Sequence, residues 1–186
     1  LPMATLGQDG QSYLDRLQHL GISREFVRLI DEAYTAQAMI MTDRDNNQIT
    51  AFHPGAMAHA QVNTVSARPD IRLGIISPDG REAMLLHAEQ MHAAGIPFVF
   101  DPGQGLPMFD GAELAHLIGL ATWVTVNDYE GKMLCERTGW SAAELSTRVQ
   151  GLIITLGAQG CEVWVQGQCT VVPPVTAQQV VDPTGC

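Results

Sequence analysis

The chain has 186 residues, enough for a sizeable buried core, and its 46% hydrophobic and 16% charged residues are typical of a globular protein. A formal net charge of −10, with one lysine against nine arginines, argues against a nucleic-acid-binding protein, because such proteins need basic surface against phosphates. No apolar run is long enough to cross a bilayer. Four cysteines without a CxxC pair and six histidines without an HExxH motif argue against a zinc site, and idle thiols fit a reducing, cytoplasmic location.

The first part of the chain predicts a helix followed by a hairpin. Residues 10–20 have the apolar spacing of an amphipathic helix, with Gly21 as its stop. Two extended runs follow at 34–42 and 48–53, separated by the turn-forming residues 44–47. Such a hairpin does not belong to a βαβ repeat, so we expect it to form a small separate sheet.

From Ile71 onward, strands and helices alternate, which is typical of an α/β protein with a mostly parallel sheet. The pattern predicts strands at 73–77, 96–100, 122–126 and 152–156, helices at about 80–94, 110–118, 128–137 and 141–148, and a hairpin formed by 161–166 and 168–173. Residues 152–156 are uninterruptedly apolar, which favours a parallel strand covered on both faces. We expect one domain core with a lid-like sheet.

Both ends of the sequence suggest an internal fragment. The chain opens at Leu1 inside what resembles a structural unit, and it stops just after Asp182-Pro183-Thr184-Gly185, a turn signal that normally leads into another element. We therefore expect residues 1–186 to be part of a larger domain.

Polar residues follow three successive predicted strands. Asp101, Asn127 and Thr155 with Gly157 stand at the carboxyl ends of these strands, where open α/β sheets bind their ligands. Common nucleotide motifs are absent: Lys132 is followed by Met133, which excludes a Walker A loop, and no GxGxxG follows a strand. The arrangement therefore predicts a site without defining its reaction.

The remaining motifs each have two interpretations. Asn127 and Glu130 lie one helical turn apart and could hold the water shell of Mg²⁺, or they could simply cap a helix and offset its dipole. Thr155, Gly157 and Gly160 could let the backbone approach a nucleotide, or form an ordinary turn after a strand. The segment 182–185 could begin a helix whose free N–H groups bind an anion, or be any Asp-Pro turn. Spacing alone favours the structural interpretation of the first two of these motifs.

Taken together and in this order, the motifs resemble the PfkB, or ribokinase, family of carbohydrate kinases. The family signature Asp-Thr-x-Gly-x-Gly-Asp is followed through its first five positions by residues 182–186, with Pro183 in place of Thr. Its Asn-x-x-Glu motif matches Asn127 and Glu130, and its Thr-x-Gly-x-x-Gly loop matches Thr155, Gly157 and Gly160. The segment 4–10 resembles the family's segment leading into the helix after its substrate glycines, and the segment 34–53 resembles its β lid. Residues 43–57 resemble bacterial adenosine kinases in particular.

The resemblance implies a ribokinase-like (Rossmann-like) fold, with a central mostly parallel sheet flanked by helices and an antiparallel lid. It also implies transfer of the ATP γ-phosphoryl group to a hydroxymethyl group. Gly185 would form the anion hole, Asn127 and Glu130 would order Mg²⁺, and Thr155, Gly157, Gly160 and Thr184 would line the nucleotide. Asp182 would lie where relatives often bind K⁺. The catalytic Asp and the substrate glycines of the family lie outside residues 1–186, so we expect these residues alone to be inactive.

For the acceptor, adenosine is the first hypothesis, with Phe52 and Gln37 as candidate contacts. Phe52 could stack on a base or could only pack the lid. The alternatives are a ribokinase-like sugar kinase and a catalytically dead ligand sensor of the same fold. The exposed apolar side of a small lid sheet also suggests a homodimer through the lids, as in ribokinase.

Overall fold

A computed structural model describes residues 1–44, 48–66 and 70–176 of the chain. The chain divides into two compact units, Leu1–Ile96 and Pro97–Cys186, which are described separately. In the described part of the chain, no helix is long and apolar enough to pass through a membrane.

The first unit begins with a strand–helix–strand arrangement. Strands β1 (Met3–Gly7) and β2 (Phe26–Ile30) pair in parallel with Met3 opposite Phe26, and helix α1 (Gln11–His19) connects them. The 3₁₀ helix η1 (Gly55–Val62) packs against β1, where the Thr5 hydroxyl donates to the Ala56 carbonyl at 2.7 Å. The sequence pattern predicted α1 but neither of these two short strands.

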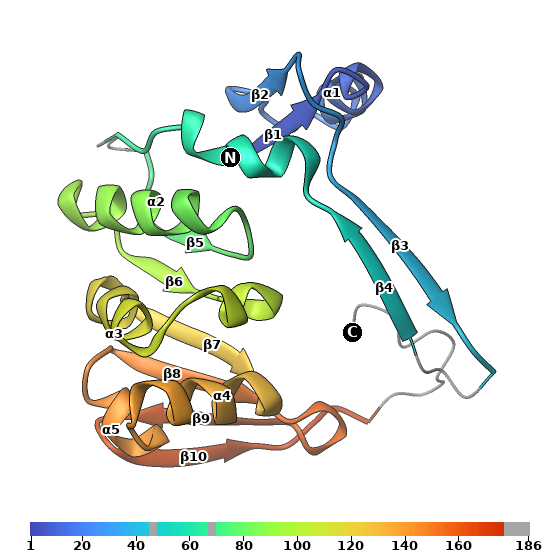
Figure 1. The fold of residues 1–186 in the computed structure, drawn as a ribbon. Coiled ribbons are helices and arrows are strands. Elements are labelled where there is room, and N and C mark those ends of the chain that lie inside the picture. The colour runs from blue at the N-terminus through green and yellow to red at the C-terminus, as the bar shows by residue number, and fades with distance from the viewer. Residues whose placement is uncertain (45–47, 67–69, 177–186) are drawn as a thin grey trace. The chain divides into compact units, whose positions relative to one another are not determined.

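The predicted hairpin is present. Strands β3 (Gln37–Thr42) and β4 (Gln48–His53) pair antiparallel, with Ala38 opposite Phe52 and Thr42 opposite Gln48, and they form a two-stranded sheet of their own (Figure 1). Every residue of both strands is exposed. The end of the hairpin between Arg44 and Gln48 lies outside the described residues. We call residues 37–53 the lid hairpin.

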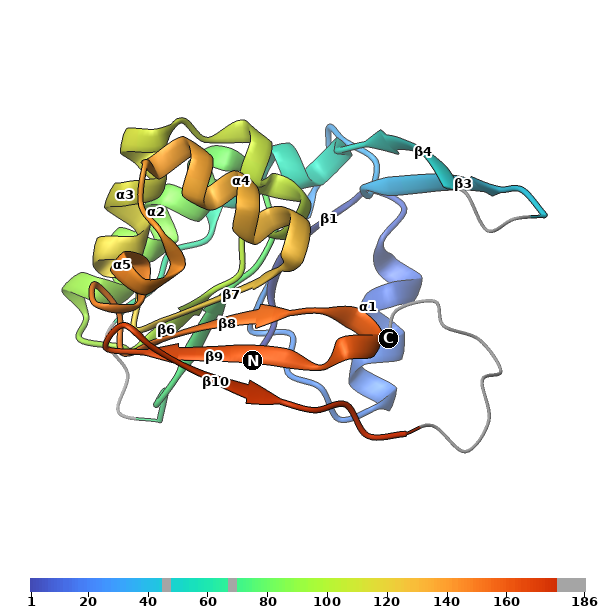
Figure 2. The same ribbon diagram turned by 90° about the horizontal axis from the view of Figure 1, so that it is seen from below.

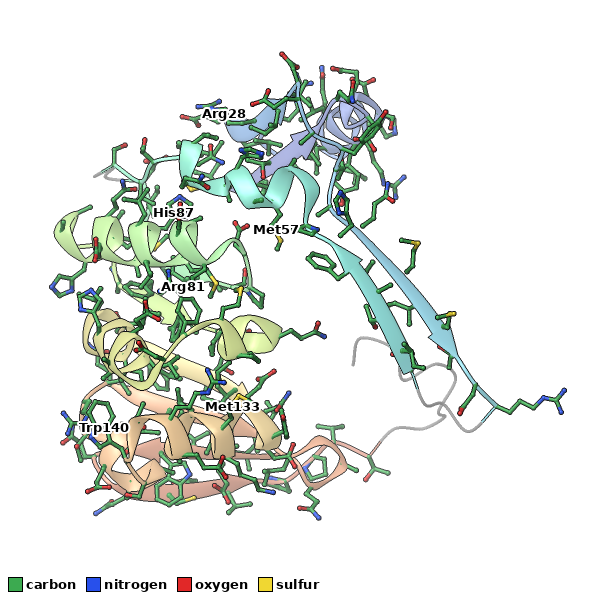
Figure 3. The ribbon with its side chains drawn as sticks, viewed as in Figure 1. Arg28, Met57, Arg81, His87, Met133 and Trp140 are labelled. Carbon is green, nitrogen blue, oxygen red and sulfur yellow. The ribbon has the colours of Figure 1, made fainter. Side chains whose placement is uncertain are left out.

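The first unit ends with strand β5 (Gly74–Ile76) and helix α2 (Arg81–Ala93). His87 is buried, and its imidazole extends from α2 toward the chain after η1 (Figure 3), where Nε2 hydrogen bonds the Asn63 carbonyl at 3.0 Å. The amide of the buried Asn63 donates to the Ala4 carbonyl at 3.1 Å. These bonds join η1, β1 and α2.

In the described residues of the second unit, strands β6 to β10 form a sheet with helices on one face (Figure 2). Strands β6 (Phe98–Phe100), β7 (Trp123–Asn127) and β8 (Gly151–Thr155) are parallel, and β9 (Cys161–Val165) and β10 (Gln168–Val172) continue the sheet antiparallel in the order β10-β9-β8-β7-β6. Helices α3 (Gly111–Leu120), α4 (Asp128–Thr138) and α5 (Ala142–Ser146) cover it. The mostly parallel α/β prediction is confirmed.

The core of this unit lies between the sheet and these helices. Its fully buried side chains come from strands and helices alike: Phe98, Phe100, Leu114, Leu117, Ile118, Val124, Leu134 and Leu152. Helix α4 packs closely on the sheet, because a Cβ at Gly131 would make ordinary van der Waals contact with Ile154 and Val126 at 3.5 Å. On the other face of β8, Ile153 is only half-buried within this unit.

One boundary prediction needs correction, and three short helices were not predicted. The helix predicted at 141–148 ends at Ser146, because the Thr147 hydroxyl bonds back to the Glu144 carbonyl at 2.8 Å and the chain then turns toward β8. Arg148 instead stacks over the Trp140 ring at 3.7 Å. The 3₁₀ helices η1, η2 (Gly103–Met108) and η3 (Gly157–Gln159) were not predicted, because segments this short have little periodicity.

Candidate active site

The carboxyl edge of the parallel strands brings three predicted polar residues to one side of the second unit. Phe100 pairs with Val124, and Asn127 pairs with Thr155, so the chain leaves β6, β7 and β8 at the same edge. Asp101 follows β6 directly, while Asn127 and Thr155 are the last residues of their strands. The sequence predicted this placement, because parallel strands share the direction in which they end.

Asn127 and Glu130 form a complete capping box at the start of α4. The Asn127 side-chain oxygen accepts from the Glu130 N–H at 2.8 Å, and Glu130 Oε2 accepts from the Asn127 N–H at 2.9 Å. The structural interpretation of this pair is therefore correct. The Asn127 NH₂ group and the second Glu130 oxygen take no part in the box, so capping leaves polar atoms at the edge of the sheet.

Asp101 adds a second carboxylate at this edge. Burial raises the pKa of Asp101 above its ordinary value, repulsion from Glu130 raises it further, and a hydrogen bond from the Gly103 N–H partly offsets both effects. Asp101 follows β6 and Glu130 lies in the first turn after the neighbouring parallel strand β7, so the two carboxylates stand at the same edge of the sheet. A bound cation would relieve this repulsion, which makes the edge suited to a positively charged ligand.

The donor set fits Mg²⁺ better than a metal held by many side chains. Among residues 1–44, 48–66 and 70–176, no three His, Cys, Asp or Glu side chains come together as a metal cage. Mg²⁺ keeps several waters and is usually bound through one or two carboxylates together with substrate phosphates. Glu130 with Asp101 could supply these carboxylates, and Asn127 could bond the water shell.

The predicted nucleotide loop after β8 is a tight turn. Gly157 and Gly160 have φ angles of +56° and +91°, which favour glycine, and the Leu156 N–H donates to the Gly160 carbonyl at 2.8 Å. A Cβ on Gly160 would overlap the Val172 carbonyl oxygen, so glycine here serves the approach of two backbone segments. At Gly157, apart from its two neighbours in the chain, no atom of the described residues lies within 4 Å of an added Cβ. Gly157 is thus the glycine whose surroundings leave room for a ligand.

The other motif residues are placed differently. Asp182, Thr184 and Gly185 lie outside the described residues. Phe52 and Gln37 both lie on the lid hairpin of the first unit, and Phe52 is 53% exposed. Gln37 pairs with His53, whereas Phe52 pairs with Ala38. Cross-strand partners share a face and neighbours along a strand alternate, so Phe52 and Gln37 point to opposite faces of the hairpin.

Arg137 makes contacts that the sequence did not reveal. From the last turn of α4, its Nη1 donates to the carbonyls of Pro107 at 3.0 Å, Leu106 at 3.3 Å and Phe109. It thereby ties the segment that follows Asp101 to the helix that carries Glu130. The sequence signal, a basic residue near a helix C-terminus, predicts only an interaction with the helix dipole.

Two cavities in the described part of the chain do not enclose the candidate residues. The first unit has a cavity of about 580 Å³ lined mainly by β5 and α2, and none of the predicted site residues lines it. The second unit has one of about 460 Å³ along α4, β8 and β9, which includes Asp128 and Leu156 beside the edge but not Asn127 or Glu130. The strand edge and the chemistry of its side chains, rather than cavity size, mark the candidate site.

Residues 3–186 of the chain match the sequence model of the pfkB family of carbohydrate kinases. The chain belongs to the pfkB family of carbohydrate kinases. A curated nucleoside kinase from Methanocaldococcus jannaschii is 29% identical over 186 residues, which cover 98% of this chain and 61% of that protein. The chain thus spans about three fifths of the length of this relative.

Solved structures of family members agree. The nucleoside kinase of Burkholderia thailandensis in complex with inosine is 55% identical with a TM-score of 0.93, and the match covers 99% of this chain and 61% of that one. A structure of the same enzyme in complex with ADP-inosine matches with a TM-score of 0.91. The ribokinase of Cryptococcus neoformans, at 20% identity and a TM-score of 0.75, shares the fold, covering 98% of this chain and 64% of that one. The ribokinase-like fold is confirmed.

Proposed function

We propose that the protein is an ATP-dependent nucleoside kinase, which transfers the γ-phosphoryl group of ATP to the hydroxymethyl group of a nucleoside. The observation that carries this proposal is the 55% identity, over 99% of the chain, to a nucleoside kinase whose structure contains inosine. Adenosine is our first candidate acceptor, and inosine is the second because that relative binds it. Because the chain spans about three fifths of that relative's length, the activity is proposed for the whole protein.

The second unit would hold the nucleotide and its metal. Phosphoryl transfer depends mainly on positioning and charge stabilisation. When bound, Mg²⁺ would neutralise charge on the transferring phosphoryl group. Glu130 and Asp101 would hold the hydrated ion, and the Asn127 amide would orient its waters. Thr155, Gly157 and Gly160 would line the nucleotide, and Thr184 and Gly185 would bind its phosphates, with K⁺ near Asp182.

The lid hairpin would contact the nucleoside through the face that carries Phe52. On this face Ala38 and Ile40 form with Phe52 an apolar patch against which a base can stack, beside the polar Thr50, Thr42 and Gln48. Gln37 lies on the opposite face together with Met39 and Met41. We therefore propose Phe52, rather than Gln37, as the base contact, which narrows the two candidates to one.

The opposite face is our candidate for a homodimer through the lids. Met39, Met41 and Ile49 are each more than half exposed, and an uncovered apolar face is suited to a second copy of the protein. Light scattering of the full-length protein and of Met41→Asp tests this: a dimer that the substitution converts to a monomer supports the interface. A wild-type monomer would contradict the proposed dimer.

The proposed site of action is the cytoplasm, where ATP is available.

The experiment is ADP release by the full-length protein with Mg²⁺-ATP, comparing adenosine, inosine, ribose and fructose as acceptors. Turnover with nucleosides but not free sugars supports the proposal. Turnover with ribose or fructose alone would make the protein a sugar kinase of the same family. A protein that binds a nucleoside without any turnover would be a ligand sensor.

A further inference from the structure

The short segment that precedes the lid hairpin is held by a network of hydrogen bonds within the first unit. Asp9 Oδ1 accepts from both the Thr35 N–H and the Thr35 hydroxyl, each at 2.8 Å. The Thr35 oxygen in turn accepts from the Gly7 N–H at 3.0 Å. These bonds join residues 26 and 28 positions apart, so they fix Thr35 to the turn between β1 and α1.

The other end of the lid hairpin meets the same segment. The Ala56 N–H donates to the Tyr34 carbonyl at 2.8 Å. Gly55 has a φ of +48°, and a Cβ on it would overlap the Tyr34 carbonyl oxygen. A Cβ on Gly7 would also overlap the Tyr34 backbone. Both connections of the hairpin therefore pass through one close backbone crossing at Tyr34 and Thr35.

Beyond this crossing, the described residues of the hairpin strands bury no side chain. All residues of β3 and β4 are exposed, and the two strands form a sheet separate from β1 and β2. An isolated two-stranded hairpin is at best marginally stable in water. Its direction within the first unit is therefore determined largely at its base, two residues before Gln37.

We infer that Asp9 is a positioning residue that sets the direction of the lid hairpin through Thr35, and thereby places Phe52 for the nucleoside. This inference rests on the proposed function. Asp9 acts through Thr35 and not by contact with substrate. Hydrogen bonds from Thr35 lower the pKa of Asp9, so its carboxylate is ionised at neutral pH and its bonds to Thr35 are charge-assisted.

The test compares four variants of the full-length protein. Asp9→Ala removes the acceptor, Thr35→Val removes the hydroxyl, and Thr35→Ser retains it. Asp15→Asn is the matched control, because Asp15 is an exposed carboxylate of the same unit whose bond, from Gln11 at 2.9 Å, lies within α1. The measurements are KM for inosine, KM for ATP and the melting temperature.

Hydrogen bonds to charged groups contribute appreciably to the stability of the conformation that they hold. We therefore expect Asp9→Ala and Thr35→Val to raise KM for inosine about tenfold. KM for ATP should stay within about twofold of wild type. Thr35→Ser and Asp15→Asn should behave as wild type. Equal rises in both KM values, or a change in Asp15→Asn as large as in Asp9→Ala, would overturn the positioning role.

A second measurement does not depend on activity. Hydrogen exchange of the amides in residues 34–42 and 48–56 should be faster in Asp9→Ala than in wild type, while exchange in β6–β8 is unchanged. Unchanged exchange in the hairpin overturns the inference. Faster exchange in a protein without kinase activity would preserve the role of Asp9 at the lid base while the proposed function fails, so the two failures are distinguishable.

Discussion

Replacing Asn127 separates its capping role from its proposed role at the phosphates. Asn127→Ala removes the acceptor for the Glu130 N–H, which costs about 1 kcal/mol of stability, the usual value of an N-cap. Asn127→Ser keeps a capping oxygen, so its stability should stay within about 0.5 kcal/mol of wild type. Both variants lose the amide NH₂, so both should lose activity.

For activity we expect kcat/KM to fall about 10- to 100-fold in both variants, the effect commonly seen when an outer-shell partner of a metal site is lost. The Mg²⁺ concentration for half-maximal rate should also rise. The assays are urea unfolding and ADP release at varied Mg²⁺ in the full-length protein. The matched control is Ser141→Ala, which breaks the equivalent capping box of α5, with its 3.2 Å bond to the Glu144 N–H, away from the strand edge.

Ser141→Ala should lose about as much stability as Asn127→Ala but retain full activity. The reasoning would be refuted if Asn127→Ser had wild-type kcat/KM and wild-type Mg²⁺ dependence, because Asn127 would then only cap α4. It would also be refuted if Ser141→Ala lost activity in proportion to its stability.

Three further predictions follow from particular contacts. Phe52→Ala should raise KM for nucleosides about tenfold, because about 1–3 kcal/mol of base stacking is lost. Gln37→Ala should leave KM for nucleosides unchanged. Steady-state kinetics that showed the reverse pattern would contradict the assignment of Phe52 as the base contact. Arg137→Met should lower unfolding free energy by about 1–3 kcal/mol in urea, because three carbonyls lose a donor, and an unchanged midpoint would refute the tether. Burial raises the pKa of Asp79 above its ordinary value, so the native state favours the protonated side chain. The free energy of unfolding therefore falls as pH rises from the ordinary pKa through the raised pKa. Asp79→Asn should therefore be more stable than wild type at pH 7 but not at pH 3, and a pH-independent difference would contradict the assignment.

Local chemistry explains what the sequence predicted well. The start of α4 followed from Asn127 as an N-cap, and the start of α5 followed from Ser141 as an N-cap with Glu144 completing a capping box. The donors and acceptors of both caps lie within four residues. The strand edge with Asp101, Asn127 and Thr155 followed from counting strands and their direction. Each of these features depends on neighbours in sequence, so a single sequence can reveal it.

Features that depend on distant residues were missed. Strands β1 and β2 are short and have little apolar alternation, and they become recognisable only through their parallel pairing. The hydrogen bonds from Arg137 to the carbonyls of residues 106–109, and those from Thr35 to Asp9, join residues about 30 positions apart. The faces of Phe52 and Gln37 required the register of the hairpin, which a one-residue shift would have changed. Such relations arise from packing that no local pattern encodes.

The most direct test of the account is to identify the product formed from inosine and Mg²⁺-ATP by the full-length protein, using mass spectrometry and ³¹P NMR. The account predicts a nucleoside monophosphate phosphorylated on the hydroxymethyl group, formed in equal amount to ADP and reduced in Asn127→Ser. Release of inorganic phosphate without phosphorylated nucleoside, or transfer only to a free sugar, would contradict it.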